Sequence, residues 1–290
     1  MRARSALFTL LGDVVRPGGG EAWLTPLTEA MVALGFTAQA TRTALHRMTN
    51  QGWVEPRRVG RYAAYRLTGK GADRLREAAE RIYRLEATQW DGRWHLLLAD
   101  LTDVPPPSPA ALSLRSADAG ASAARGELAR TLRWMGFGSL PGGIWVSPHD
   151  HGEQLEALLT AAGVRQSALS FVSHGAVAGK ITQADRCIVT QAWDLGQLRV
   201  AHAAFLERWV DQEPPHDPRQ AFATRIRLVH DWRSFLFLDP GLPGPLLPDD
   251  WLGQRAATCF HDLYARLAPQ AQAWWDDVTA GVPTSSARTA

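Results

Sequence analysis

Apolar residues recur every three to four positions near the start of the chain, which predicts a series of α-helices. We expect these helices over residues 4–16, 25–34 and 38–51. Thr25 and Thr37 are the predicted N-caps of the second and third helices, and Gly35 is the predicted C-terminal cap of the second. Two helices joined by a short, glycine-containing turn form the pattern of a helix-turn-helix.

The third of these helices has two chemically different faces. Small and apolar residues are expected to face the preceding helices, namely Ala40, Ala44, Leu45 and Met48. Hydrogen-bonding residues are expected on the outer face, namely Gln39, Arg42, Thr43, His46 and Arg47. Side chains of these types recognise phosphates and the edges of bases, so the outer face is a candidate for the major groove of DNA.

Two short strands follow the third helix and predict a β-hairpin with a glycine turn. The strands are expected over residues 53–58 and 62–67, and Thr68 is expected to cap a helix over residues 69–85. Four arginines lie on or near the hairpin: Arg57, Arg58, Arg61 and Arg66. We expect Arg57, Arg58, Arg61 and Tyr62 to contact the DNA backbone, or the adjacent minor groove, as the wing of a winged helix. The alternative is a winged helix that contacts protein, which would not require four arginines together.

Strands and helices alternate in the central part of the chain. Strands are expected over residues 95–100, 144–146 and 168–172, and helices over residues 125–135 and 154–162. A loop rich in Pro, Ser and Ala spans residues 104–124, and a glycine-rich turn spans residues 136–143. This order predicts a small α+β sandwich of ferredoxin-like type.

The last part of the chain is predicted to be helical. Helices are expected over residues 197–209, one or two over 218–238, one from about 248 towards 267, and a final one over 268–279. The predicted fold class is therefore α+β, divided into a winged helix-turn-helix domain (1–88), a ferredoxin-like domain (89–178), a helical domain for effector binding or dimerisation (179–283) and a flexible tail (284–290). A chain of 290 residues is long enough for two or three such domains.

Charge is distributed unevenly along the chain, although the formal net charge is only +2. Residues 1–88 carry 14 Arg and Lys against 8 Asp and Glu, a balance of +6, while the remainder carries 17 against 21, a balance of −4. This asymmetry predicts an anionic partner for the N-terminal part alone.

Cysteine content and hydropathy bear on the compartment. The two cysteines, Cys187 and Cys259, are too few for a disulfide framework and fit a reducing environment. No apolar run approaches the roughly 20 residues that cross a bilayer, and no cleavage site of a signal peptide follows the N-terminus. We therefore expect a cytoplasmic protein that does not enter membranes.

Several segments together resemble the PaaX family of transcriptional regulators, the repressors of phenylacetic acid catabolism. They are residues 5–13 (SALFTLLGD), 40–45 (ATRTAL), 52–53 (GW), 65–68 (YRLT), 90–94 (WDGRW), 143–148 (GIWVSP), 228–233 (LVHDWR) and 239–243 (DPGLP). Their order and spacing make the resemblance specific, and it covers nearly the whole chain.

The resemblance implies a DNA-binding repressor of a catabolic operon. It implies a winged helix, a central domain similar to the CRISPR-associated ferredoxin-like nucleases, and a helical C-terminal domain. It further implies a homodimer that binds an inverted repeat in double-stranded DNA and is released by an acyl-CoA thioester such as phenylacetyl-CoA. No cofactor and no enzymatic activity are implied.

Two groups of residues are candidates for the effector site, because an aromatic acyl-CoA needs cations for its phosphates and an aromatic pocket for its acyl group. One group is Arg93 with Trp94. The other consists of Arg225, Arg227, His230, Trp232 and Arg233. The alternative is that tryptophans such as these are core and domain-interface residues.

A metal site and a nuclease are the remaining alternatives. His149, Asp150 and His151 are adjacent, which makes it difficult for them to converge on one ion without further ligands, so no metal is expected. Asp100 ends the first central strand, at the position where the related nucleases carry a metal-binding carboxylate. Only Asp91 and Asp103 lie near it in sequence, and a similar fold does not transfer chemistry.

Overall fold

The computed structural model describes residues 1–60, 62–83, 90–99, 120–174 and 181–280. The described residues form two compact units. The first unit draws on residues 1–85, 202–235 and 253–290, and the second on residues 86–201 and 236–252. The domain boundaries expected at residues 88 and 178 stay a prediction. The first compact unit contains the N-terminal segment together with helices from the C-terminal part of the chain.

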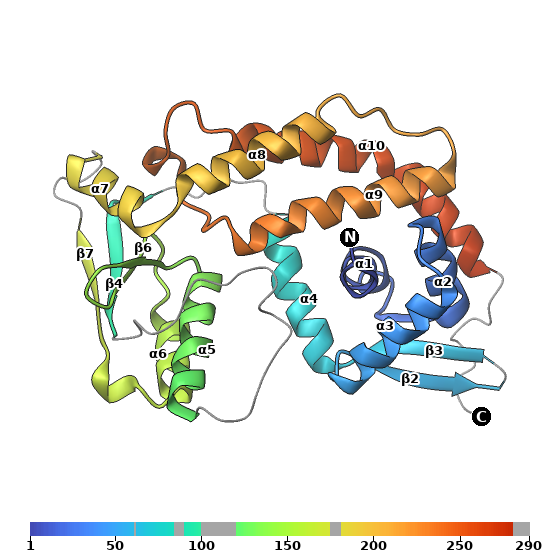
Figure 1. Ribbon diagram of the computed structural model, residues 1–290, viewed down its shortest axis with the longest axis horizontal. Helices are drawn as coiled ribbons and strands as arrows, with labels where there is room; N and C mark the ends of the chain where they lie inside the picture. Colours follow the sequence, from blue (N-terminus) through green and yellow to red (C-terminus); the bar gives the residue numbers. More distant parts are fainter. Residues whose placement is uncertain (61, 84–89, 100–119, 175–180, 281–290) are drawn as a thin grey trace. The chain divides into compact units, whose positions relative to one another are not determined.

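The first unit contains the predicted N-terminal helices and hairpin (Figure 1). Its elements are α1 (Ala3–Leu10), the π-helical turn η1 (Leu11–Val15), β1 (Glu21–Trp23), α2 (Leu24–Ala33), α3 (Ala38–Asn50), β2 (Val54–Val59), β3 (Tyr62–Leu67), α4 (Gly69–Ile82), α9 (Pro218–Trp232) and α10 (Gly253–Ala280). The strands form an antiparallel sheet in the order β1-β3-β2, in which β2 and β3 are the hairpin.

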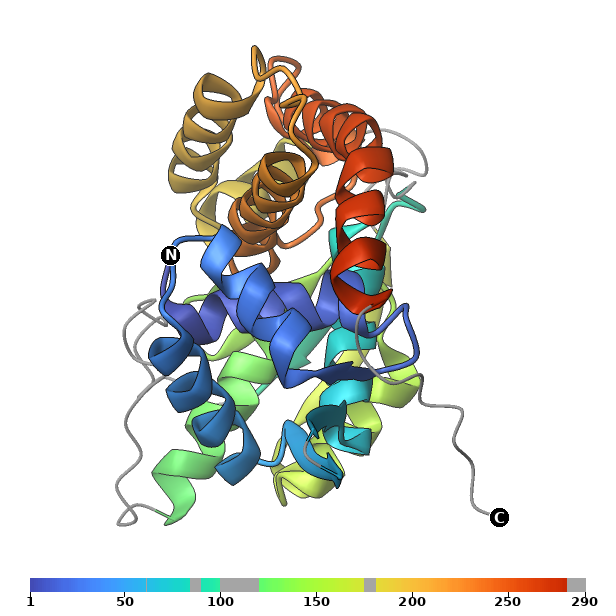
Figure 2. The same cartoon turned by 90° about the vertical axis from the view of Figure 1, so that its right-hand side faces the viewer.

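A single hydrophobic core joins both ends of the chain in the first unit. Leu7 of α1, Met31 of α2 and Leu45 of α3 are fully buried in it. Phe222 and Ile226 of α9 belong to the same core, as does Ala271 of α10. Figure 2 shows the red helix α10 reaching the blue N-terminal helices, in agreement with the contacts of α10 and α9 with α2. Helices from the two ends of the chain therefore fold as one body.

The second unit is built on a four-stranded antiparallel sheet. Its elements are β4 (Arg93–Leu98), α5 (Gly120–Trp134), β5 (Gly138–Leu140), β6 (Ile144–Ser147), α6 (Gly152–Ala161), η3 (Arg165–Ser167), β7 (Leu169–His174), α7 (Gln183–Ala192) and η5 (Gly244–Leu246). The strand order is β5-β6-β4-β7. Helix α8 (Leu195–Trp209) and the 3-10 turn η4 (Arg233–Phe237) contribute residues to both units.

Each face of this sheet has its own hydrophobic cluster. Leu97 and Trp145 pack with residues of α5 and α6 on one face. Trp94 and Val146 pack with Val189 of α7 and with the segment that contains η5 on the other face. Alternation along β4 explains the division, because successive strand residues point to opposite faces.

Most predicted elements are confirmed. Thr37 caps α3 by accepting a hydrogen bond from the backbone N–H of Ala40, and Thr68 caps α4 in the same way. Gly35 has a φ of 93°, a left-handed conformation that glycine adopts without strain, as expected for a C-terminal cap. The hairpin strands begin and end within one residue of the expected positions.

Three expectations about elements are wrong. Thr25 does not cap α2, because β1 continues directly into a helix that begins at Leu24. The turn expected over residues 136–143 contains the short strand β5, and the capped helix α7 was not expected. The two helices expected to meet near residue 268 are the single helix α10, which continues through Pro269. Leu267 and Ala271 are both buried, so tertiary packing holds the helix on each side of the proline.

No helix in the described part of the chain is long and apolar enough to cross a membrane.

Candidate DNA-binding surface

Helix α3 is fixed to the first unit by one face and exposed on the other. Thr41, Ala44, Leu45 and Met48 are buried. All five predicted recognition residues are exposed: Gln39, Arg42, Thr43, His46 and Arg47. Ala40, expected to face inward, is half-buried, and Thr41 takes the fully buried position on that side.

Two side-chain interactions on the outer face of α3 are made between residues of the helix itself. The Thr43 hydroxyl donates to the Gln39 carbonyl oxygen at 3.0 Å, and the side chains of His46 and Asn50 lie 3.3 Å apart. Asn50 is an exposed polar residue on the last turn that sequence analysis did not select. Asn50 follows His46 by four residues, and this spacing could have placed it on the same face of the helix.

The β2–β3 hairpin lies beside α3, and β2 contacts that helix (Figure 1). Arg57 and Arg58 point to opposite faces of the hairpin, because side chains alternate along a strand. Arg58 is exposed and shares its face with Val54, which is buried in the core. Gly60 forms the turn with a φ of 59°. Arg61 lies outside the described residues.

Glu21 of β1 holds two of the hairpin arginines. Its carboxylate accepts hydrogen bonds from Arg57 Nη2 at 2.6 Å and from Arg66 Nε at 3.0 Å. Tyr62 is half-buried and makes an edge-to-face contact with Trp23, their ring centroids being 6.0 Å apart. Arg57 and Tyr62 therefore have contacts within the sheet, whereas Arg58 is an exposed arginine on the opposite face.

The buried carboxylate of Asp13 links η1 to α4 and to the C-terminal helices α9 and α10. Asp13 Oδ1 accepts hydrogen bonds from the hydroxyls of Tyr83 at 2.5 Å and Tyr264 at 2.8 Å, and Oδ2 accepts one from Arg225 Nε at 2.9 Å. Arg225 also donates to the Tyr264 hydroxyl at 2.7 Å. The four residues come from η1, the C-cap of α4, α9 and α10, so one ion-pair network links four segments.

The network shifts the pKa values of its members. Burial and the adjacent Asp13 carboxylate raise the pKa of Tyr83, and the same causes raise the pKa of Tyr264 to about 12. Burial lowers the pKa of Arg225, but the attraction of Asp13 outweighs it and the net pKa is raised. The tyrosines are therefore neutral donors and the arginine a permanent cation.

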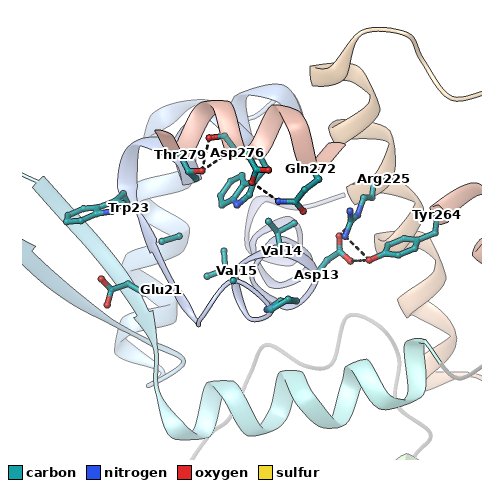
Figure 3. Close-up of a pocket in the computed structure, with 14 residues that line it drawn as sticks. Asp13, Val14, Val15, Glu21, Trp23, Arg225, Tyr264, Gln272, Asp276 and Thr279 are labelled. Carbon is teal, nitrogen blue, oxygen red and sulfur yellow. Dashed lines mark hydrogen bonds and ion pairs between the residues drawn. The ribbon is translucent and has the colours of Figure 1, made fainter. Parts of the chain in front are cut away.

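A cavity of about 590 Å³ opens beside this network (Figure 3). It is lined by Asp13, Val14, Val15, Pro17, Gly18, Glu21, Ala22, Trp23, Arg225, Tyr264, Gln272, Trp275, Asp276 and Thr279. Three carboxylates and one guanidinium line it, and that guanidinium is already paired with Asp13. Such a lining is unfavourable for the phosphates of a CoA ester.

The predicted effector residues of α9 make structural contacts in the first unit. The Trp232 ring stacks on Phe260 at 4.9 Å, and its indole N–H donates to the carbonyl oxygen of Ile82. Arg233 donates to the Ser5 hydroxyl, and burial lowers its pKa to about 10. His230 Nδ1 lies 3.3 Å from the Thr9 hydroxyl, and burial lowers its pKa to about 4.

The remaining predicted effector residues are spread over both units. Arg227 is half-buried on α9. In the second unit, Arg93 is exposed and pairs with Asp91 at 3.6 Å. The buried Trp94 donates to Asp185 Oδ1 at 2.9 Å and stacks on Trp193. The assignment of these residues to an effector site remains a prediction.

His149, Asp150 and His151 belong to a polar cluster in the second unit. His151 Nε2 lies 3.0 Å from the Ser147 hydroxyl, and the His151 backbone N–H donates to His95 Nδ1. Burial, with the neighbouring His149 and His95, lowers the pKa of His151 to about 4. Within the described ranges, no group of three or more His, Cys, Asp or Glu side chains is placed to hold a metal ion. Asp100 and Asp103 lie outside those ranges.

Comparison with known sequences identifies the family. Family models match residues 2–71 (PaaX-like protein), 120–185 (PaaX protein central Cas2-like domain) and 193–277 (PaaX-like protein C-terminal domain). Together these matches cover most of the chain, which belongs to the PaaX-like family. The predicted resemblance is confirmed.

One relative and one solved structure extend the comparison. The chain is 31% identical over 277 residues to the Transcriptional repressor PaaX of Escherichia coli strain K12, covering 93% of this chain and 82% of that protein. It also resembles the uncharacterized protein Rv0674 of Mycobacterium tuberculosis, with a TM-score of 0.58, 24% identity, and coverage of 94% of this chain and 98% of the other. The second likeness concerns the fold alone.

Proposed function

We propose that this protein is a DNA-binding transcriptional repressor, and that the exposed face of α3 enters the major groove. The observation that carries the proposal is a row of exposed donors on a helix whose opposite face is buried, with an arginine-bearing hairpin beside it. Membership of a family that includes the repressor PaaX supports the same function. The excess of positive charge in residues 1–88 supports an anionic partner.

The finer fold assignment is part of this proposal. Helices α2 and α3 with the β2–β3 hairpin fit a winged helix-turn-helix, in which the hairpin is the wing. In the second unit, the order β4-α5-β5-β6-α6-β7 and the sheet order β5-β6-β4-β7 fit a ferredoxin-like domain.

The exposed residues divide into two roles. Arg42 with Gln39, Thr43, His46 and Arg47 would contact base edges, which gives sequence discrimination. Arg58 would contact the phosphate backbone, together with Arg57, Arg61 and Tyr62. Arg57 contributes less than Arg58 in this proposal, because Glu21 already neutralises part of its charge.

An acyl-CoA thioester is the proposed effector, and a cytoplasmic homodimer the proposed binding form. Effector binding would favour an arrangement in which the two recognition helices no longer match half-sites that lie about 34 Å, or a multiple of it, apart. By linkage, operator DNA must then weaken effector binding by the same factor. Thermal-shift measurements with phenylacetyl-CoA, other acyl-CoA thioesters and free CoA test this part, and equal effector affinity with and without operator would contradict it.

Two arginine variants test the DNA site once an operator has been selected from random duplexes. Arg42→Ala should lose discrimination between operator and mutated operator by about 1–3 kcal/mol, the contribution of a bidentate contact to guanine. Arg58→Ala should weaken operator and random DNA alike and reduce the magnitude of the salt slope of log affinity by about 1.

Arg186→Ala is the matched control, because Arg186 is an exposed arginine in the second unit. Fluorescence anisotropy across a salt titration measures all three variants. The proposal is wrong if Arg42→Ala and Arg58→Ala both behave like Arg186→Ala.

A further inference from the structure

The cavity beside Asp13 is formed by residues of the first unit alone. Its volume of about 590 Å³ is in the range of sites that hold a whole small molecule. Figure 3 shows Glu21 and Trp23 at the end nearer the hairpin. Asp13 and Arg225 lie at the other end, and Asp276 of α10 lies between the two ends. The cavity therefore reaches from the buried ion-pair network to β1, the strand that pairs with β3 of the hairpin.

One of the three cavity carboxylates has no counter-ion. Asp13 pairs with Arg225, and Glu21 pairs with two arginines of the hairpin. The Asp276 carboxylate accepts a hydrogen bond at 2.8 Å from the neutral amide of Gln272, and it pairs with no cation among the described residues. Asp276 is exposed, so a ligand from solution can reach it. An uncompensated negative charge therefore remains at this cavity.

Most of the other lining residues are apolar, namely Val14, Val15, Pro17, Ala22, Trp23 and Trp275. The Trp275 ring stacks on Phe222 with an interplanar angle of 5°, and Trp23 contacts Tyr62 edge to face. These contacts fix the positions of both indole rings. Such a wall is complementary to the apolar body of a ligand, and the face of a tryptophan ring also attracts a cation.

We propose that this cavity binds a small organic amine, in which an ammonium group is joined to an aromatic or branched apolar body. The ammonium group donates hydrogen bonds to the Asp276 carboxylate, and the body lies against the apolar wall. A ligand with a carboxylate in place of the amine is disfavoured, because Asp276 would repel it and Arg225 is already paired with Asp13. The amine is chemically distinct from the acyl-CoA thioester proposed above as effector.

The end of the cavity nearer the hairpin links this site to DNA binding, and this link rests on the proposed function. Trp23 contacts Tyr62, and Glu21 holds Arg57 by a hydrogen bond of 2.6 Å. A ligand that displaces either side chain of β1 changes a contact that holds the wing. We expect a bound amine to weaken operator binding about fivefold or more, the usual size of coupling between two sites.

Three indoles that differ in charge test the class of ligand. Tryptamine carries an ammonium group, 3-propylindole has a methyl group in its place, and indole-3-acetate carries a carboxylate. Calorimetric titration of the full chain without DNA measures the three affinities. We expect tryptamine to bind at least tenfold more tightly than 3-propylindole, and indole-3-acetate not to bind.

Two variants of adjacent residues on α10 test the location. Asp276→Asn removes the charge and keeps the shape of the side chain, and it should weaken tryptamine binding about tenfold. Asp277→Asn is the matched control, because Asp277 is exposed on the same helix and does not line the cavity. Thermal melting followed by circular dichroism checks that both variants are folded.

Two results would overturn the amine site: tryptamine that binds no more tightly than 3-propylindole, or Asn variants that bind tryptamine equally. Fluorescence anisotropy with labelled operator measures the link to DNA, and an operator affinity unchanged by saturating tryptamine would contradict that link. In Asp276→Asn the same tryptamine concentration should have little effect on operator binding. Because tryptamine binding is measured without DNA, its failure is distinguishable from a failure of α3 to bind DNA, which Arg42→Ala tests.

Discussion

Asp13 shows how the meaning of a single residue depends on contacts remote in sequence. Its partner Arg225 is 212 positions away, and the pair is almost entirely buried. Arg225 and Arg233 stand near tryptophan in the sequence, which suggested an anion-binding site, but both side chains have hydrogen-bond partners in the first unit. Local sequence shows which groups are present and not which of them are already paired.

The same limit applies at the hairpin. Sequence predicted four arginines on or near one hairpin, and strand alternation could have separated Arg57 from Arg58. The partner Glu21 was not predictable, because it lies on a three-residue strand whose pairing with β3 joins segments 45 positions apart.

The buried His230 should make the free energy of unfolding depend on pH. Burial first, and then the nearby Arg233, lower its pKa from 6.5 to about 4, so the folded protein holds it neutral. The unfolded chain binds a proton near pH 6.5, and the stabilisation from this neutral histidine is therefore present above that pH and lost as the pH falls towards 4. His230→Gln should flatten the decrease in unfolding free energy between pH 6.5 and 4.

Urea titrations at half-unit pH intervals measure this decrease. His216→Gln is the control, since His216 is an exposed histidine at the end of the loop before α9. Equal pH profiles for wild type and His230→Gln would show that this residue does not titrate in the expected manner.

At the scale of elements, caps and periodicity predicted most of the fold. Thr37, Thr68 and Gly35 are local signals, and each lies where the sequence placed it. Strands β1 and β5 were missed because three residues give no periodicity and their pairing is non-local. The sequence predicted two helices that meet near residue 268, but burial of the residues on each side of Pro269 maintains the single helix α10.

Two glycines at the start of α4 differ in the space around them, and substitutions at the two should therefore differ in their effect on stability. A Cβ atom on Gly71 would lie 2.2 Å from the carbonyl oxygen of Trp53, whereas one on Gly69 meets nothing within 4 Å. Gly71→Ala should force the backbones apart and destabilise the protein by about 1–3 kcal/mol. Gly69→Ala should be neutral or stabilise it by up to about 1 kcal/mol.

Chemical denaturation of the two glycine variants measures both effects. Equal stabilities would mean that the helix shifts to accommodate the methyl group at no cost. A loss of DNA affinity in Gly71→Ala that exceeds its loss of stability would indicate that the hairpin has moved relative to α3.

At the scale of the whole molecule, the sequence predicted an N-terminal domain over residues 1–88, and the hydrophobic core of this segment also includes residues of α9 and α10. Phe222 and Ile226 are buried among residues of α1, α2 and α3. Sequence order could not reveal this arrangement, because hydrophobic periodicity shows that a helix has an apolar face and not what that face contacts.

A fragment of residues 1–88 should therefore fold poorly. Without α9 and α10 it would expose the apolar faces of α1 and α2 and leave Asp13 without Arg225. We expect dye binding typical of exposed apolar surface and a broad urea transition, compared with the full chain. A fragment that unfolds cooperatively and holds operator at full affinity would contradict this prediction.

The shared core also has a consequence for the order in which the protein becomes competent during synthesis. Helix α3 leaves the ribosome early, but the α10 residues that complete its support are translated more than 200 positions later. The nascent chain would remain unable to occupy a promoter until the ribosome has passed residue 280. Prematurely terminated products would then be cleared by proteolysis and would not compete with intact protein for the same genomic targets.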